Sequence, residues 1–114
     1  MHELSIALSL VDLAEEEAGR QGGRVCTVYL RLGALAGVVK EALLSSYEMA
    51  CADTLLEGSR LVIEEVPVVV FCPACQALRP LSGLQAFTCA ECGTPTPDIR
   101  QGKELELVAL EVES

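Results

Sequence analysis

Two pairs of cysteines carry the clearest chemistry in this sequence. Two residues separate Cys72 from Cys75 and Cys89 from Cys92, and thirteen residues lie between the pairs. This spacing lets both sulfurs of one tight turn reach a single ion, and a second turn completes a tetrahedron of thiolates. Zinc suits thiolates because it is borderline soft and imposes no geometry of its own. The spacing therefore predicts a zinc ribbon with four cysteine ligands.

The predicted zinc is structural, because four thiolates leave no open position for water or substrate. The ion should contribute on the order of 10 kcal/mol to the folding of the ribbon. Backbone amides in such turns donate to the thiolates, which favours a residue tolerant of a left-handed backbone after the second cysteine. Gly93 meets this requirement, whereas Gln76 meets it less well and implies strain or a different turn.

The first three residues, Met1-His2-Glu3, form a second arrangement that could bind a metal. The α-amine of Met1 and the amide nitrogen and imidazole Nδ1 of His2 can close adjacent chelate rings, and the amide or carboxylate of Glu3 can complete four donors. A planar, nitrogen-rich set suits Ni(II) or Cu(II) rather than zinc. An isolated histidine near a terminus is more often an exposed residue without a role. At this point both interpretations stay open.

The elements that position these residues follow from the hydrophobic pattern. Helical spacing of apolar residues predicts helices from Glu3 to about Arg20 and from about Val38 to Leu56. Alternating patterns predict strands at 24–32, 60–66 and 104–112. Cys26 falls on the inner face of the first strand and Cys51 in the second helix, so we expect both to be small buried residues.

The order of these elements predicts an α+β fold, with two helices packed on a small, about three-stranded sheet. All five prolines and both cysteine pairs lie between positions 67 and 97, which marks an insertion. We therefore expect an α/β domain built from residues 1–66 and 99–114, and a zinc-ribbon domain at 67–98.

Composition excludes several classes of protein. With 114 residues, 51% hydrophobic and 22% charged, the chain is not disordered. Eight Lys and Arg against seventeen Asp and Glu give a net charge of −9, which argues against binding nucleic acid or an anionic membrane. In the stretch 71–98, Arg79 is the one cation, against Glu91 and Asp98.

No apolar stretch is long enough for a membrane span, and the first residues lack the basic region of a signal peptide. We therefore expect a cytoplasmic protein with reduced thiols. Three adjacent acidic residues, Glu15 to Glu17, form either a solvated helix face or a docking surface for a basic partner.

The sequence as a whole resembles the HypA/HybF family. The resemblance is carried by Met1-His2-Glu3-Leu4-Ser5, by the segment 28–39 with its glycines, and by the run 61–67 that leads into the paired cysteines. It implies a nickel metallochaperone that helps insert nickel into [NiFe]-hydrogenase, working with the GTPase HypB and the hydrogenase large-subunit precursor. In some bacteria, such a protein also serves urease.

The resemblance also implies roles for individual residues. Met1, His2 and Glu3 take the nickel-binding positions, with His2 as the essential ligand. The zinc-binding positions fall on Cys72, Cys75, Cys89 and Cys92. Some members place a carboxylate at the start of the second helix, where this sequence has Lys40 followed by Glu41.

Three functions are compatible with these residues. The first is the nickel carrier, which binds Ni(II) at its N-terminus and is not an enzyme. The second is an acidic zinc-ribbon adaptor without a role in metal transfer. The third is a thiol oxidoreductase that uses Cys72 and Cys75, but a closed zinc site and the lack of a second histidine as general base disfavour it. The resemblance favours the carrier.

Overall fold

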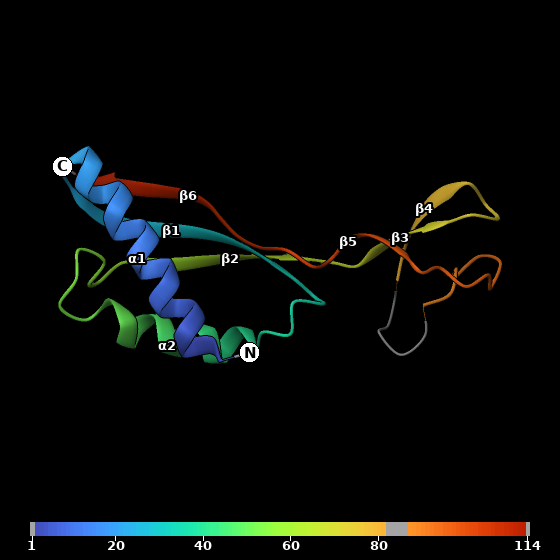
Figure 1. Cartoon of the computed structure of the whole chain (residues 1–114), viewed down its shortest axis with the longest axis horizontal. Helices are drawn as coiled ribbons and strands as arrows, with labels where there is room; N and C mark the ends of the chain where they lie inside the picture. Colours follow the sequence, from blue (N-terminus) through green and yellow to red (C-terminus); the bar gives the residue numbers. More distant parts are fainter. Residues whose placement is uncertain (1, 82–86, 114) are drawn as a thin grey trace. The chain divides into compact units, whose positions relative to one another are not determined.

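The structure is a computed structural model that describes residues 2–81 and 87–113. Its helices and first strands are α1 (Glu3–Gln21), β1 (Arg24–Gly33), α2 (Lys40–Cys51) and β2 (Arg60–Val66). The remaining strands are β3 (Val69–Cys72), β4 (Ala77–Pro80), β5 (Asp98–Gln101) and β6 (Leu105–Glu113). The described strands form two three-stranded sheets, in the orders β2-β1-β6 and β4-β3-β5 (Figure 1). The expected α+β class is confirmed.

The chain divides into two compact units. Unit 1 consists of residues 1–31, 37–64 and 106–114, and unit 2 consists of residues 32–36 and 65–105. Unit 1 therefore contains both helices, and unit 2 contains all four cysteines of the two pairs.

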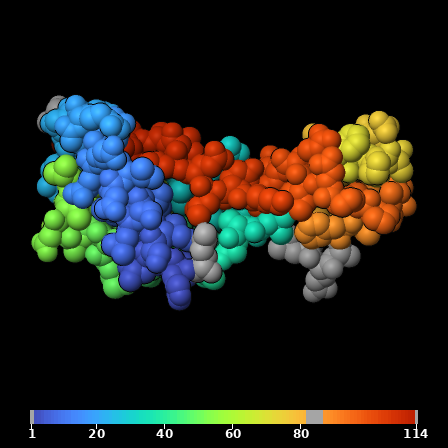
Figure 2. Space-filling model, viewed as in Figure 1, coloured from blue at the N-terminus to red at the C-terminus, as the bar shows by residue number. Residues whose placement is uncertain are grey.

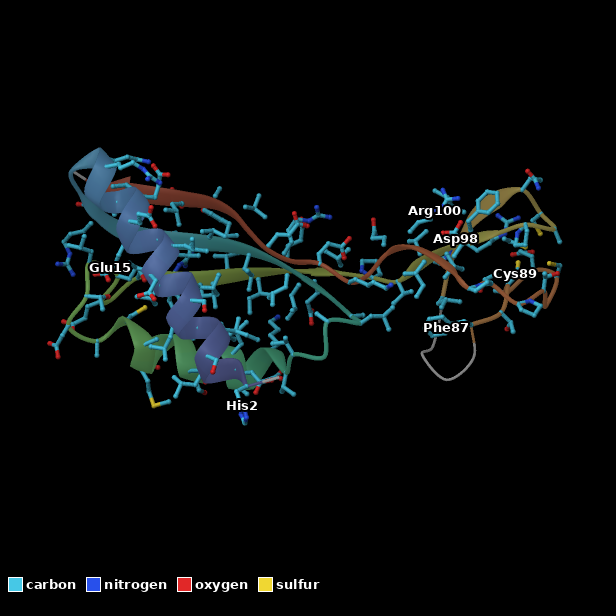
Figure 3. All side chains as sticks on the ribbon, viewed as in Figure 1. His2, Glu15, Phe87, Cys89, Asp98 and Arg100 are labelled. Atoms are coloured by element: carbon cyan, nitrogen blue, oxygen red, sulfur yellow. The ribbon has the colours of Figure 1, made fainter. Side chains whose placement is uncertain are left out.

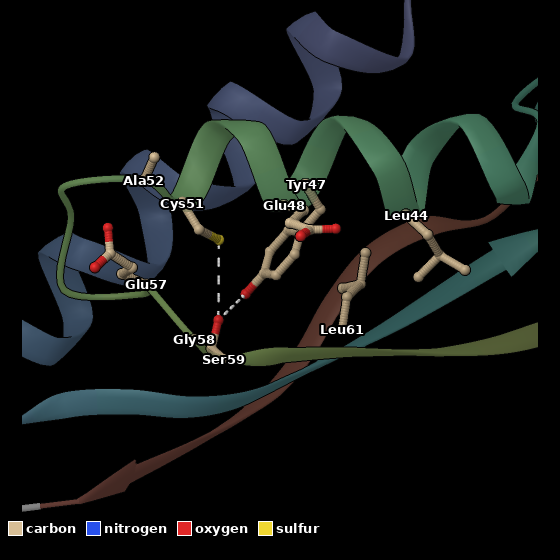
Figure 4. A pocket seen from close by; sticks show the side chains of 9 residues that line it. All are labelled: Leu44, Tyr47, Glu48, Cys51, Ala52, Glu57, Gly58, Ser59 and Leu61. Carbon is tan, nitrogen blue, oxygen red and sulfur yellow. Dashed lines mark hydrogen bonds between the residues drawn. The ribbon is translucent and has the colours of Figure 1, made fainter.

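Unit 1 is built around the inward faces of its two helices. Helix α1 packs against α2, and Figure 4 shows both helices on the same side of the strands. Apolar residues recur along α1 at helical spacing, and its buried residues are Ile6, Ala7, Leu10, Val11, Ala14 and Ala18. The outer surface of α1 is open to solvent, as the space-filling view shows in blue (Figure 2). Burial of the inner stripe holds the helix in place.

Helix α2 is shorter than the pattern predicted, because it ends at Cys51 rather than near Leu56. The backbone of Ala52 is extended, and Asp53 has a positive φ of 62°. The hydroxyl of Thr54 then donates to the carbonyl of Cys51 over 2.7 Å. This side-chain bond replaces a helical one at the last turn, which is how threonine competes with a helix.

Strand β1 changes the phase of its alternation in the middle. Val25 and Thr27 are buried, but the next residue, Val28, is buried too, and the inner face then continues through Leu30. The prediction that Cys26 is buried is therefore wrong: its thiol is exposed and donates to the carbonyl of Glu111 over 3.3 Å. At the start of β1 it is thus Val25 and Thr27, rather than Cys26, that are buried.

Unit 2 contains a small antiparallel sheet with β3 at its centre. Along β4, Val70 pairs with Arg79 and Cys72 pairs with Ala77. Val70 and Cys72 are fully buried. Because directly opposed residues lie on the same face of a sheet, Arg79 shares the face of Val70 and Cys72.

No helix among the described residues is long and apolar enough to cross a membrane.

Candidate metal sites

The ribbon brings the four predicted cysteines together, although they come from different segments. The first pair lies at the end of β3 and in the turn before β4, and the second pair lies between Phe87 and β5. We refer to Cys72, Cys75, Cys89 and Cys92 as the four-cysteine cluster. Within the described ranges, it is the one group of His, Cys, Asp or Glu side chains whose ligand atoms converge on a common point.

The spacing of the sulfurs fits a tetrahedral zinc. All four Sγ atoms lie within 4.8 Å of one another. The Sγ atoms of Cys72 and Cys92 are 3.6 Å apart, and those of Cys75 and Cys89 are 3.9 Å apart. Zn–S bonds of about 2.3 Å in a tetrahedron require sulfurs about 3.8 Å apart. The donor set and its dimensions therefore match the metal that the sequence predicted.

Both cysteine turns have the backbone that donation to thiolates requires. Gly93 has a φ of 75°, and Gln76 has a φ of 55°, so each turn passes through the left-handed region. The amide of Cys75 donates to the Sγ of Cys72 over 3.3 Å. Gln76 adopts this conformation, which is rare for a residue with a side chain, and its side-chain amide donates to the carbonyl of Pro73 over 2.8 Å. The turn at Gln76 is therefore of the same kind as the turn at Gly93, and Gln76 adopts it at the cost of backbone strain.

The thiols of the cluster do not share one proton affinity. The backbone amides of Cys92 and Glu91 lower the pKa of Cys89 to about 6, and the Cys92 amide has the larger effect. The neighbouring sulfurs of Cys92 and Cys72 raise the pKa of Cys75 to about 11. Four thiolates this close repel one another, so a shared divalent cation is needed for all four to be deprotonated together.

The sequence did not predict that Arg79 would lie near the cluster. There, Arg79 entered only the count of charged residues. The sulfurs of Cys75 and Cys89 raise the pKa of its guanidinium. The strand pattern offered a signal, because Arg79 follows Ala77 by two positions, and Ala77 lies opposite Cys72. Alternation alone places Arg79 on the sulfur side of β4.

The start of the sequence lies at the beginning of α1. His2 is the residue before the first helical turn, with an extended backbone (φ −83°, ψ 118°). Its side chain is exposed, makes no capping hydrogen bond and points away from the helix (Figure 3). Met1 lies outside the described residues. The first amides of a helix have no intrahelical acceptor, so these backbone nitrogens are not committed to the helix.

The carboxylate of Glu3 joins the starts of the two helices. Its Oε2 accepts a hydrogen bond from the amide of Val39, the residue before α2, over 3.1 Å. This bond, followed by one from its own amide, lowers the pKa of Glu3. An ionised carboxylate is also favourable at the positive end of a helix. Glu3 thus places a carboxylate at the start of α2.

The acidic cluster on α1 is engaged locally. Glu16 and Glu17 form ion pairs with Arg20 at 3.4 and 3.1 Å. Glu15 accepts a hydrogen bond from the amide of Leu55 over 3.1 Å. All three carboxylates thus make contacts within the chain, which favours a structural helix face over a docking surface.

A pocket of about 510 Å³ lies beside α2, lined by residues from Leu44 to Leu61 (Figure 4). The hydroxyls of Tyr47 and Ser59 are 2.7 Å apart at its wall, and the Sγ of Cys51 is 3.9 Å from Ser59. Burial raises the pKa of both Tyr47 and Cys51. Cys51 is buried, as predicted, and its protonated thiol is a poor nucleophile.

Comparison with known sequences gives a match over nearly the whole chain. Residues 1–112 match the family described as hydrogenase/urease nickel incorporation, metallochaperone, HypA. The chain is 52% identical to a hydrogenase maturation factor HypA from Roseiflexus sp. (strain RS-1) over 114 residues, 99% of this chain and 93% of that protein. It is 43% identical to one from Geobacter metallireducens over 113 residues, 99% of this chain and 100% of that protein.

Comparison with solved structures gives the same fold. A solution structure of a HypA protein superposes with a TM-score of 0.72 at 26% identity, covering 99% of this chain and 97% of that one. The solution structure of the nickel metallochaperone HypA from Helicobacter pylori gives a TM-score of 0.65 at 27% identity, covering 98% and 97%.

Proposed function

Because this chain belongs to the HypA family of nickel metallochaperones, we propose that it carries Ni(II) as cargo on Met1, His2 and Glu3 and delivers it for [NiFe]-hydrogenase maturation. The family resemblance inferred from the sequence is confirmed. The observation that carries the proposed site is the start of α1, where an exposed imidazole without a capping bond stands beside helix-end amides.

The chemistry of this site is ligand exchange. An amine, backbone amide nitrogens and an imidazole supply a planar, nitrogen-rich set of donors, which Ni(II) favours. The bond between Glu3 and Val39 supports the site, because it fixes the first turn of α1 while the imidazole of His2 stays accessible. An exposed set of donors at a helix end can be shared with a second protein, so nickel can pass from one ligand set to the next without a free ion.

The four-cysteine cluster is proposed to hold the resident zinc. When bound, zinc supplies four metal–sulfur bonds that fold the ribbon, and it takes no part in chemistry. The residues of the cluster hold the ion in a closed site, which supports a carrier rather than an enzyme. The domain division at 67–98 remains a proposal on the same grounds.

The proposed partners follow from the family. They are the GTPase HypB and the hydrogenase large-subunit precursor and, where urease is present, urease maturation proteins. We propose that the chain meets these partners in the cytoplasm, where thiols stay reduced for zinc. The net charge of −9 supports proteins, rather than nucleic acid or anionic membranes, as partners.

A nickel titration tests the proposal. Zinc-loaded protein beginning at Met1 is titrated with Ni(II) by calorimetry, alongside His2→Ala and a form with one extra residue before Met1. We expect one tight site in the parent and its loss in both altered forms. Ser9→Ala, an exposed change on the same helix, is the matched control and should bind as the parent does.

The alternative is an acidic adaptor that binds partners but no nickel. It is favoured by the exposed leucines of α1, Leu4 and Leu8, which are 44% and 49% accessible. The same titration decides between the two. If the parent and His2→Ala give the same nickel isotherm, the adaptor stands and the carrier is wrong.

A further inference from the structure

Arg79 is placed where it can act on the four-cysteine cluster. Among residues 71–98 it is the only cation in the sequence. The register of β4 on β3 places it opposite Val70, on the face where Val70 and Cys72 are completely buried. The alternate residues, Phe71 and Leu78, pair on the other face, and Leu78 is 55% exposed.

Hydrogen bonds within the protein satisfy only part of the Arg79 guanidinium. Its Nε is buried and has no hydrogen-bond partner among the described residues. One terminal nitrogen lies 3.5 Å from the carbonyl of Leu78, at the limit of a hydrogen bond. A buried N–H without a partner is costly, and a nearby anion is the acceptor that best offsets this cost.

The sulfurs of the cluster provide such an anion. Arg79 lies two positions along β4 from Ala77, which pairs with Cys72, so Arg79 shares a face of the sheet with that member of the cluster. Four thiolates on Zn²⁺ carry a formal charge of −2. Arg79 is half-buried, so water screens its attraction to this anion less than it would at a fully exposed position.

We infer that Arg79 is a positioning residue of the zinc site, whose guanidinium faces the thiolates of the four-cysteine cluster and helps the cluster retain zinc. The inference rests on the proposed zinc site. Arg79 reduces the repulsion among the thiolates and competes with protons for the sulfur lone pairs. Partners that bond to metal ligands commonly change metal affinity 10- to 100-fold when removed.

Arg100 provides a matched control in the same unit. It lies on β5, pairs with Asp98 at 2.9 Å, and its guanidinium lies 4.7 Å from the ring centre of Phe71. Phe71 belongs to the face opposite Val70 and Cys72. Replacing either arginine with glutamine removes one positive charge from the ribbon, but only Arg79→Gln removes it from the sulfur side.

The first experiment measures zinc affinity of the full chain by competition with a chromophoric chelator. We expect Arg79→Gln to bind zinc about tenfold more weakly than the parent, and Arg100→Gln to bind as the parent does. Equal affinity of Arg79→Gln and the parent would overturn the inference, as would an equal loss in both variants. A parent that holds no zinc would instead disprove the zinc site itself.

A second experiment separates direct contact from loss of folding. With Co(II) in place of zinc, the sulfur-to-cobalt charge-transfer band reports how tightly the thiolates hold their electrons. A cation beside sulfur stabilises those electrons, so Arg79→Gln should shift the band to longer wavelength. Arg79→Lys keeps the charge, so its band should lie between those of Arg79→Gln and the parent. The Arg79→Lys variant still tests the contact if Arg79→Gln folds poorly. An unchanged band in Arg79→Lys and Arg79→Gln would contradict the contact.

Discussion

Unit 1 buries the inner faces of two helices against long strands, whereas unit 2 arranges strands of four residues around four sulfur atoms. In unit 1, completely buried apolar side chains such as Leu30, Leu43 and Leu56 form a continuous core. In unit 2, the corresponding side chains are Val70 and Cys72, and the second of these is a proposed metal ligand. Small units of this kind depend on a metal because their apolar core is too small.

The difference in core size is consistent with a different role for the metal proposed in each unit. An ion that stays bound can lie in a unit whose folding depends on it. A cargo ion must leave without unfolding its carrier, and the proposed nickel ligands accordingly lie at the start of α1, on the unit with its own core. Each prediction below alters one unit at a time.

The largest effect should follow removal of zinc. A strong chelator removes on the order of 10 kcal/mol of folding free energy from the ribbon. Hydrogen exchange should then accelerate throughout unit 2, while the buried amides of α1 and α2 keep their protection. Helical circular dichroism before and after chelation provides the second measurement. Equal loss of protection in both units would mean that unit 1 depends on the ribbon and that the comparison is wrong.

The next largest effect should come from the core of unit 1. Leu43 is 0% exposed, so Leu43→Ala should lower the free energy of unfolding of unit 1 by about 2–5 kcal/mol. Met49 lies on the same helix at 64% exposure, and Met49→Ala should change stability by less than about 0.5 kcal/mol. Urea unfolding followed by helical circular dichroism measures both, and zinc affinity should be equal in the two variants. A zinc affinity that falls in Leu43→Ala alone would contradict independent units.

Much of this division was predictable from the sequence, because its signals are local. The spacing of the two cysteine pairs and the helical periodicity of α1 are both signals carried by short segments, although Leu4, Leu8 and Leu13 of the predicted stripe are exposed. Local patterns failed where a side chain overrode them. Thr54 ends α2 with a bond to Cys51, although the apolar periodicity continues to Leu56.

The remaining differences depend on distant partners. Cys26 is exposed although Val28, two positions further along β1, is buried, which a strict alternation does not reveal. The bond from Val39 to Glu3 joins residues that are 36 positions apart. Neither is visible in a short stretch of sequence, since tertiary contact decides both.

An intermediate effect is expected at Gly33, which belongs to unit 2. A Cβ there would collide with the carbonyl oxygen of Gly102 and would lie 2.6 Å from the amide nitrogen of Glu104. Both are backbone atoms, so Gly33→Ala should cost about 1–3 kcal/mol through overpacking. Zinc-dependent protection in unit 2 should fall accordingly in hydrogen exchange.

Gly19 in α1 is the matched control, since nothing lies within 4 Å of a Cβ built there. Gly19→Ala should stabilise unit 1 by about 0.5–1 kcal/mol, because alanine favours the helix. If the two glycine variants destabilise their units equally, the close approach at Gly33 is not what matters.

A small destabilisation at neutral pH should come from Tyr47, whose hydroxyl is 2.7 Å from that of Ser59. Tyr47→Phe loses this hydrogen bond and should cost unit 1 about 1 kcal/mol at roughly pH 7. Burial raises the pKa of Tyr47 in the folded state above the value of about 10 in an unfolded chain. The folded state therefore holds the proton more tightly, so this stabilisation is complete below about pH 10 and is lost as pH rises further.

Alkaline pH therefore reduces the difference in unfolding free energy between the parent and Tyr47→Phe. Phenylalanine does not titrate, so the stability of Tyr47→Phe should decline less between about pH 9 and about pH 11 than that of the parent. Cys51, whose pKa burial also raises, is present in both proteins, so its contribution is shared. Urea unfolding at each pH, followed through the helices, measures the difference. If the stabilities of the parent and Tyr47→Phe decline in parallel, burial of the Tyr47 hydroxyl in the core of unit 1 does not raise its pKa.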